Sequence, residues 1–253
     1  MKGWPYPKLI AHRGGGHLAP ENTLAAVRVG HALGYRMIEV DAKLSSDGVA
    51  MLLHDATLDR TTDGEGPAGA LTWARLQHRD AGFWHSEPFV GEHIPSLEAL
   101  AELCLAEGIA VNIEIKPSPG TDESTGEAVA RLAATYWRGA AVAPLLSSFS
   151  RVALAAAKSA VPSLPRALIA ESPTDKDLAF LDEIDAVSLH SGWRAATPAL
   201  LERIHLEGRR LLVWTVNDPP AARALLDSGV DGVITDNLRQ FARRFPGYLS
   251  VPH

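Results

Sequence analysis

Residues 197–216, "TPALLERIHLEGRRLLVWTV", contain one complete helix–strand unit. Thr197 is a good helix N-cap, and Pro198 suits the first helical position, where its missing N–H would have no partner in any case. Gly208 can adopt the left-handed conformation that ends many helices. The apolar run from Arg210 to Val216 is typical of a buried strand. The stretch therefore predicts a helix that leads directly into a buried strand.

The same unit recurs along the chain. Asp218 and Pro219 repeat the cap and the proline, and Gly34, Gly108 and Gly229 each precede another apolar run. Eight such strands in a chain of 253 residues predict a (β/α)8 TIM-type barrel. A doubly wound open sheet is the alternative that fits the same alternation. The predicted strands are Lys8–Ala11, Arg36–Asp41, Ala110–Ile115, Pro144–Ser148, Arg166–Ala170, Ala186–Leu189, Arg210–Val216 and Asp231–Thr235.

The second strand is followed by a predicted hairpin. The chain continues as "AKLSSDGVAMLLHD", residues 42–55, in which Ser46, Asp47 and Gly48 form a turn signal between two β-like stretches. A turn centred between Ser46 and Asp47 pairs residues whose numbers sum to about 93. We therefore expect His54 to lie opposite Glu39.

The alternation of predicted strands and helices stops between Ala56 and Pro95. This segment is longer than a simple connection needs, so we expect a small lobe over one end of the barrel. Its aromatic residues could line a substrate entrance or form the lobe's own minor core. We accordingly predict one catalytic barrel domain, residues 1–253, with residues 56–95 as an inserted lobe.

Composition excludes several classes of partner. The chain is 46% hydrophobic and 21% charged, with a net charge of −6 and no block of basic residues, which argues against a nucleic-acid partner. No apolar run approaches the roughly 18 residues of a membrane span, so no membrane insertion is expected. Cys104 is the only cysteine, which excludes an internal disulfide and favours a reducing, cytoplasmic location. The oligomeric state stays open.

Charged residues gather where three predicted strands end. In a barrel of this kind the carboxyl ends of the strands meet at the functional face. The first strand ends in His12 and Arg13, the second in Glu39-Val40-Asp41, and the third in Glu114-Ile115-Lys116. Residues two apart on a strand point to the same face. We therefore expect these charged side chains to converge at one mouth, with Val40 and Ile115 facing the outer helices.

Three converging carboxylates need compensation. At an effective dielectric of about 20, two charges 4 Å apart repel by about 4 kcal/mol. Oxygen ligands from Glu39, Asp41 and Glu114 suit one hard divalent cation, Mg²⁺ or Ca²⁺, better than zinc. The alternative is an ion-pair network in which Arg13 and Lys116 simply neutralise the acids.

Two histidines add proton transfer to this cluster. The ordinary pKa of His12 and His54, about 6.5, suits groups that give and take protons near neutral pH. A cation, Arg13 and Lys116 would together form a compact phosphate site. These parts predict hydrolysis of a phosphate ester, in which one histidine activates the nucleophile and the other protonates the leaving alkoxide.

The motifs "AHRGGGHLAPENT", "IEVDAKLSSDG", "LLHD", "IEIK", "VWTVN" and "DGVITD" resemble those of the glycerophosphodiester phosphodiesterase family, in order from residue 11 to 236. The resemblance implies a distorted (β/α)8 barrel with a small lobe after the His-Asp motif. It also implies metal-dependent hydrolysis of a small-molecule glycerophosphodiester to sn-glycerol 3-phosphate and an alcohol.

The resemblance assigns roles to eight residues. Its histidine pair falls on His12 and His54, and its metal ligands on Glu39, Asp41 and Glu114. Arg13 and Lys116 match phosphate-contacting positions, and Trp214 matches an aromatic residue against the glycerol moiety. In the family's usual mechanism the glycerol hydroxyl attacks first to give a cyclic phosphate, although direct attack by water fits this sequence equally well.

Several further residues have weaker expected roles. We expect His17 at the rim, Asn22 and Thr23 as caps of the first helix, and Asp236 as a hydrogen-bonding support. His190 fits a supporting position near the mouth, and Phe149 fits a wall of the pocket.

Two other classes of function remain. A metal-dependent aldolase or lyase would use Lys116 as a Schiff base, which requires a desolvated lysine away from acids. A noncatalytic phosphodiester-binding protein would be expected to lose a catalytic histidine or a metal ligand, and this chain retains all five.

Overall fold

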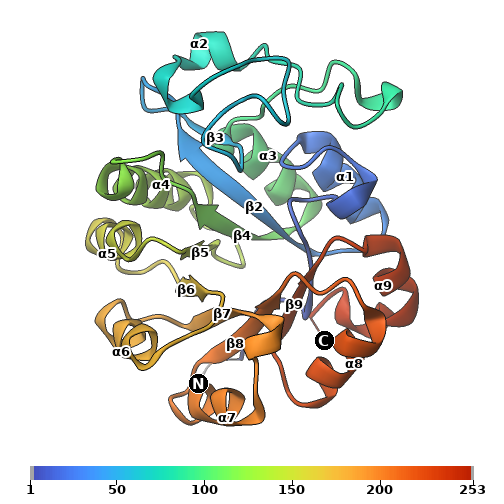
Figure 1. Ribbon diagram of the computed structural model, residues 1–253, viewed down its shortest axis with the longest axis vertical. Coiled ribbons are helices and arrows are strands. Elements are labelled where there is room, and N and C mark those ends of the chain that lie inside the picture. The colour runs from blue at the N-terminus through green and yellow to red at the C-terminus, as the bar shows by residue number, and fades with distance from the viewer. Residues whose placement is uncertain (1–2, 252–253) are drawn as a thin grey trace.

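The computed structural model describes residues 3–251, and its sheet closes on itself (Figure 1). Eight parallel strands form the barrel in the order β1-β9-β8-β7-β6-β5-β4-β2, and pairing of Ala11 in β1 with Ile38 in β2 completes the ring. This closure confirms the predicted (β/α)8 barrel and excludes the open sheet. The strands are β1 (Leu9–Ala11), β2 (Met37–Leu44), β3 (Ala50–Leu52), β4 (Ala110–Ile115), β5 (Leu145–Ser148), β6 (Arg166–Ala170), β7 (Ser188–Gly192), β8 (Arg210–Trp214) and β9 (Gly232–Thr235).

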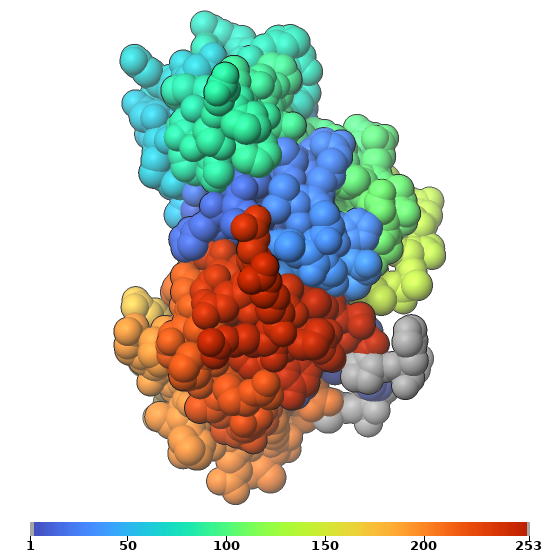
Figure 2. All heavy atoms as spheres, turned by 90° about the vertical axis from the view of Figure 1, so that its right-hand side faces the viewer, coloured from blue at the N-terminus to red at the C-terminus, as the bar shows by residue number. Residues whose placement is uncertain are grey.

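Helices surround the barrel and begin where the sequence signals predicted. Thr197 and Asp218 accept hydrogen bonds from Leu200 N and Ala221 N at the starts of α7 and α8. The helices α1 and α9 lie on the same side of the molecule, below the segment between β3 and α3 in Figure 2. The α-helices are α1 (Leu24–Ala32), α2 (Trp73–Leu76), α3 (Leu97–Glu107), α4 (Asp122–Tyr136), α5 (Arg151–Ala160), α6 (Asp175–Glu183), α7 (Pro198–Leu206), α8 (Pro219–Asp227) and α9 (Leu238–Arg244).

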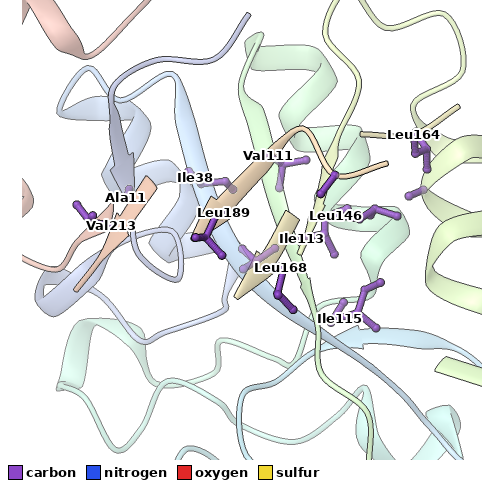
Figure 3. Packing of buried hydrophobic residues seen from close by; sticks show 14 of the residues in the cluster. Ala11, Ile38, Val111, Ile113, Ile115, Leu146, Leu164, Leu168, Leu189 and Val213 are labelled. Carbon is purple, nitrogen blue, oxygen red and sulfur yellow. The ribbon is translucent and has the colours of Figure 1, made fainter. Parts of the chain in front are cut away.

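The alternation of side chains along each strand creates two separate cores. Val111, Ile113 and Ile115 of β4 point outward and belong to a cluster that includes residues of the helices. Figure 3 shows them beside residues of the neighbouring strands in this cluster. Val40 belongs to the same outer core, as expected. A smaller cluster fills the inside of the barrel and includes Ile10, Met37 and Leu212. Apolar side chains therefore fill this part of the barrel interior. The polar side chains that also point inward lie beside this cluster.

The hairpin after β2 forms, but its register differs from the prediction by one residue. Lys43 pairs with Met51, so paired numbers sum to 94 rather than 93. The connecting loop runs from Ser45 to Val49, joined by a bond from Ser45 N to Val49 O, and is centred on Asp47. Strand β3 ends at Leu52, two residues before His54. The expected pairing of His54 with Glu39 is therefore wrong.

The segment between β3 and α3 packs around its own small apolar cluster, at the top of Figure 1. This cluster is mainly aliphatic, includes Leu58, Leu76 and Ile94, and is joined by Trp73. Phe83 and Trp84, by contrast, are exposed. The segment holds α2 and two short 3₁₀ helices, η2 (Ala68–Ala70) and η3 (Glu87–Phe89). Within residues 3–251, no helix combines the length and apolarity required to cross a bilayer.

Candidate active site

All eight residues expected in the site border one cavity of about 180 Å³. The cavity opens at the carboxyl ends of the strands, where β1, β2, β4 and β8 bring together residues distant in sequence. His54, in the loop after β3, reaches the same cavity despite the shifted register. The eight are His12, Arg13, Glu39, Asp41, His54, Glu114, Lys116 and Trp214, and Phe149 and His190 border the cavity with them.

Three buried carboxylates form the centre of the site. Glu39, Asp41 and Glu114 each offer one oxygen, and these oxygens lie within 4.8 Å of one another. Burial and the charge of Asp41 raise the pKa of Glu39 to about 8 and that of Glu114 to about 7. Metal–oxygen bonds of about 2.0–2.5 Å place ligands around one cation up to about 5 Å apart. The three residues therefore fit a divalent cation, which would remove their mutual repulsion.

The two basic residues contact the acids unequally. Lys116 Nζ lies 2.7 Å from Glu114 Oε1 and 3.6 Å from Asp41 Oδ1, whereas Arg13 Nε lies 3.7 Å from Asp41 Oδ2. Within the described chain, Glu39 has no lysine or arginine side chain in salt-bridge range. It accepts only a 3.1 Å hydrogen bond from the backbone N–H of Arg13 and faces His12 at 3.8 Å. The basic side chains alone therefore leave one buried carboxyl group uncompensated.

Asn22 orients Asp41 rather than capping a helix. Its Nδ2 donates to Asp41 Oδ2 at 2.8 Å, and its Oδ1 accepts from the backbone N–H of Asp41 at 3.0 Å. The expected cap role is therefore wrong for Asn22 and correct for Thr23, whose hydroxyl accepts from Ala26 N. Asn22 has a φ of +60°, a conformation that asparagine tolerates better than most residues. In this conformation its side-chain amide contacts Asp41.

His12 forms a pair with Asp236. Its Nδ1 lies 2.6 Å from Asp236 Oδ1, while its Nε2 faces the acids, 3.8 Å from Glu39. Burial lowers the pKa of His12, but the hydrogen bond with Asp236 and the charges of Glu39 and Asp236 outweigh this effect and leave the pKa raised. Asp236 also accepts a bond from Asn217, which fits the supporting role expected from the sequence.

His54 has a similar carboxylate partner. Its Nδ1 lies 2.6 Å from Asp55 Oδ1, and Asp55 is held in turn by Arg60. Burial lowers the pKa of His54 below its ordinary value, against the opposing effects of Asp41 and Asp55. Arg60 also binds Glu21, which contacts Arg13 at 2.6 Å. This chain of charges links the segment between β3 and α3 to the loop after β1. Asp55, Arg60 and Glu21 were not expected, although Asp55 directly follows His54 in the sequence.

Lys43 is a further residue that the sequence did not indicate. It is 1% exposed, and its ammonium donates to the backbone carbonyls of His54, at 3.2 Å, and Lys116, at 3.4 Å. Burial lowers its pKa to about 8. Lys43 thus ties together the two loops that carry His54 and Lys116.

Two aromatic residues form the wall of the cavity. The rings of Phe149 and Trp214 lie edge to face, with their centroids 5.5 Å apart, and the indole N–H of Trp214 donates to the carbonyl of His190. His17, in contrast, is a largely exposed rim residue whose Nε2 is 3.9 Å from Asp236. These positions agree with the expectations for Phe149 and His17.

Comparison with known proteins shows the family to which the chain belongs. The model of the glycerophosphoryl diester phosphodiesterase family matches residues 12–240. The chain belongs to this family of enzymes. It is 35% identical over 233 residues to a glycerophosphodiester phosphodiesterase of Caldanaerobacter subterraneus subsp. tengcongensis, covering 90% of this chain and 93% of that one.

Two solved structures share the fold of this family member over nearly its whole length. One is a phosphodiesterase of Oleispira antarctica in complex with the product sn-glycerol-3-phosphate, at 32% identity and a TM-score of 0.90, covering 95% of this chain and 97% of that chain. The other is a glycerophosphodiester phosphodiesterase of Agrobacterium tumefaciens, at 29% identity and a TM-score of 0.80, covering 94% and 99%.

Proposed function

We propose that this enzyme hydrolyses glycerophosphodiesters to sn-glycerol 3-phosphate and an alcohol, with one bound divalent cation, Mg²⁺ or Ca²⁺. The observation that carries the proposal is the buried triad of Glu39, Asp41 and Glu114, flanked in one cavity by His12 and His54. Each histidine is held at Nδ1 by its own carboxylate. The names of the relatives support the choice of substrate class.

The basic side chains bind and orient the phosphate. Arg13 and Lys116 border the cavity beside the acids, where two positive charges suit the nonbridging oxygens of a phosphodiester. Glu39, Asp41 and Glu114 would hold the cation, which when bound supplies Lewis-acid stabilisation of negative charge on the phosphoryl group. Trp214 offers a flat apolar surface to the carbon atoms of glycerol.

The two histidines transfer the protons. One accepts a proton from the attacking hydroxyl, and the other donates a proton to the oxygen of the leaving alcohol. Because Asp236 and Asp55 bind the Nδ1 atoms, the Nε2 atom of each histidine is available for proton transfer. The attacking hydroxyl belongs either to the glycerol of the substrate, which gives a cyclic phosphate that water then opens, or to water itself.

A coupled assay tests the proposal. Glycerophosphocholine is incubated with the purified protein, and the released sn-glycerol 3-phosphate is oxidised by glycerol-3-phosphate dehydrogenase. We expect turnover that EDTA abolishes and Mg²⁺ or Ca²⁺ restores. No turnover with either ion, or turnover unaffected by EDTA, would refute the proposal.

Histidine variants test the acid–base roles within the same assay. His12→Ala and His54→Ala should each reduce kcat by roughly 10²- to 10⁴-fold. His78→Ala, an exposed histidine of the inserted segment, serves as the matched control and should keep normal turnover. A near-normal rate for either active-site variant would remove that residue from the mechanism.

The aldolase alternative is disfavoured by the state of Lys116. Burial acts to lower its pKa, but the charges of Asp41 and Glu114 outweigh burial and raise it. A lysine that is protonated and bonded to Glu114 at 2.7 Å is a poor nucleophile for a Schiff base.

We also expect a cytoplasmic location for the enzyme, which fractionation of the source cells would test.

A further inference from the structure

The deep end of the active-site cavity contains polar side chains that the proposed reaction does not use. Asn112 lies on β4, two residues before Glu114, so it points to the same inner face about 6–7 Å deeper in the barrel. His190 lies on β7 and borders the same cavity. Asn112 is 1% exposed and His190 is fully buried.

The side chains of Asn112 and His190 can form further hydrogen bonds. Among the described residues, both amide atoms of Asn112 and the Nδ1 of His190 are buried without a hydrogen-bond partner. A buried polar atom without a partner costs stability, and the inside of such a barrel is ordinarily filled by branched apolar residues. The sequence therefore retains polar groups at a place where apolar ones would stabilise the fold better.

His190 is suited to bind a neutral group. Burial lowers its pKa to about 3, so the ring is uncharged near neutral pH. Its Nε2 lies 3.3 Å from the hydroxyl of Ser188, an atom that can either donate or accept. The free Nδ1 can accordingly act as acceptor or donor, depending on the tautomer. The Asn112 amide offers one donor group and one acceptor.

The surroundings of these polar atoms select the kind of ligand. Ile169, Ile234 and Trp214 border the cavity together with Asn112 and His190, whereas the carboxylates, Arg13 and Lys116 form its charged part. Apolar walls with a few uncharged hydrogen-bonding groups suit a small polyol, which has both C–H surface and hydroxyl groups. A cavity of about 180 Å³ has room for one such arm beside the phosphate.

We propose that Asn112 and His190 form a hydroxyl-recognition subsite that binds the glycerol arm of the substrate and makes the enzyme selective for glycerol-bearing diesters. This inference rests on the proposed function, since it assumes a glycerophosphodiester substrate. The leaving alcohol then extends toward the open mouth, where its identity is less constrained.

Binding of two phosphate monoesters tests the subsite without depending on turnover. The affinities of sn-glycerol 3-phosphate and of n-propyl phosphate, which lacks both hydroxyls, are measured by calorimetry with Mg²⁺ present. We expect the wild-type protein to prefer sn-glycerol 3-phosphate by at least about tenfold. In Asn112→Leu and His190→Phe this preference should fall to about threefold or less, with the affinity for n-propyl phosphate nearly unchanged.

Two controls separate recognition from folding. Val111→Ala alters the residue next to Asn112 on β4, whose side chain points outward into the helix layer, and should keep the preference. Because apolar replacement removes unpaired buried groups, the Tm of Asn112→Leu and His190→Phe should not fall, whereas a purely structural role predicts a lower Tm. If one variant does not fold, the other still tests the subsite.

The result that overturns the inference is an unchanged preference in a folded variant, or equal affinity for the two ligands in the wild type. Either result leaves the proposed function intact if glycerophosphocholine is still hydrolysed. Failure of hydrolysis by the wild-type protein would instead refute the proposed function. The ratio of the affinities for sn-glycerol 3-phosphate and n-propyl phosphate would still show whether the subsite exists.

Discussion

Replacing Asn22 with glycine removes both hydrogen bonds that hold Asp41 in place, and glycine tolerates the φ of +60° at this position. The bond to the Asp41 carboxylate is charge-assisted, and such bonds contribute about 1.5–3 kcal/mol. Since about 1.4 kcal/mol corresponds to a factor of ten, metal affinity should fall roughly 10- to 100-fold. Loss of a residue that orients a metal ligand typically has an effect of this size.

Titration calorimetry of the metal-free protein with Mg²⁺, and separately with Ca²⁺, measures this effect. Thr23→Ala is the matched control, because it removes the neighbouring helix cap, costs about 1 kcal/mol of stability, and leaves Asp41 untouched. Metal affinity should fall in Asn22→Gly and stay normal in Thr23→Ala. An Asn22→Gly protein that folds and binds both ions within twofold of the wild type would refute the role given to Asn22.

Three further predictions concern the histidines and the buried lysine. If His54 is the base and His12 the acid, the dependence of kcat/KM on pH is bell-shaped. The value of kcat/KM falls as the pH drops through the lowered pKa of His54, and it falls again as the pH rises through the raised pKa of His12. A flat profile from pH 5 to 9 would contradict this assignment. Asp236→Asn removes a charge that raises the pKa of His12, so the alkaline limb should move to lower pH and kcat should fall roughly 10²-fold, as stopped-time assays would measure. Lys43→Met removes the hydrogen bonds to the carbonyls of His54 and Lys116, so the free energy of unfolding in urea should fall by about 1.5–3 kcal/mol. An unchanged midpoint of the urea unfolding curve would show that these bonds contribute nothing to stability.

The barrel was predictable because its signals are local. Caps such as Thr197 and Asp218, the glycines before the strands, and the apolar runs each act within a few residues. The strand bounds were less accurate, since β7 runs from Ser188 to Gly192 rather than from Ala186 to Leu189. The hairpin register was wrong because a loop centred on Asp47, whose carboxylate accepts from Ser45 and Trp73, replaced the expected tighter turn.

The charged part of the site was predictable for a different reason. Parallel strands bring their carboxyl ends to one mouth, so acids such as Glu39 and Glu114 had to converge once the strands were known. The supporting contacts did not follow from this rule. The bonds from Asn22 to Asp41, and from Lys43 to the carbonyl of His54, depend on how loops fold back over the barrel.

The most direct test of the proposed reaction is a ³¹P NMR time course of glycerophosphocholine with the enzyme and Mg²⁺. We predict that the diester signal is replaced by that of sn-glycerol 3-phosphate, and that EDTA stops the conversion. An unchanged diester signal, or the appearance of phosphocholine in place of sn-glycerol 3-phosphate, would contradict the proposed function.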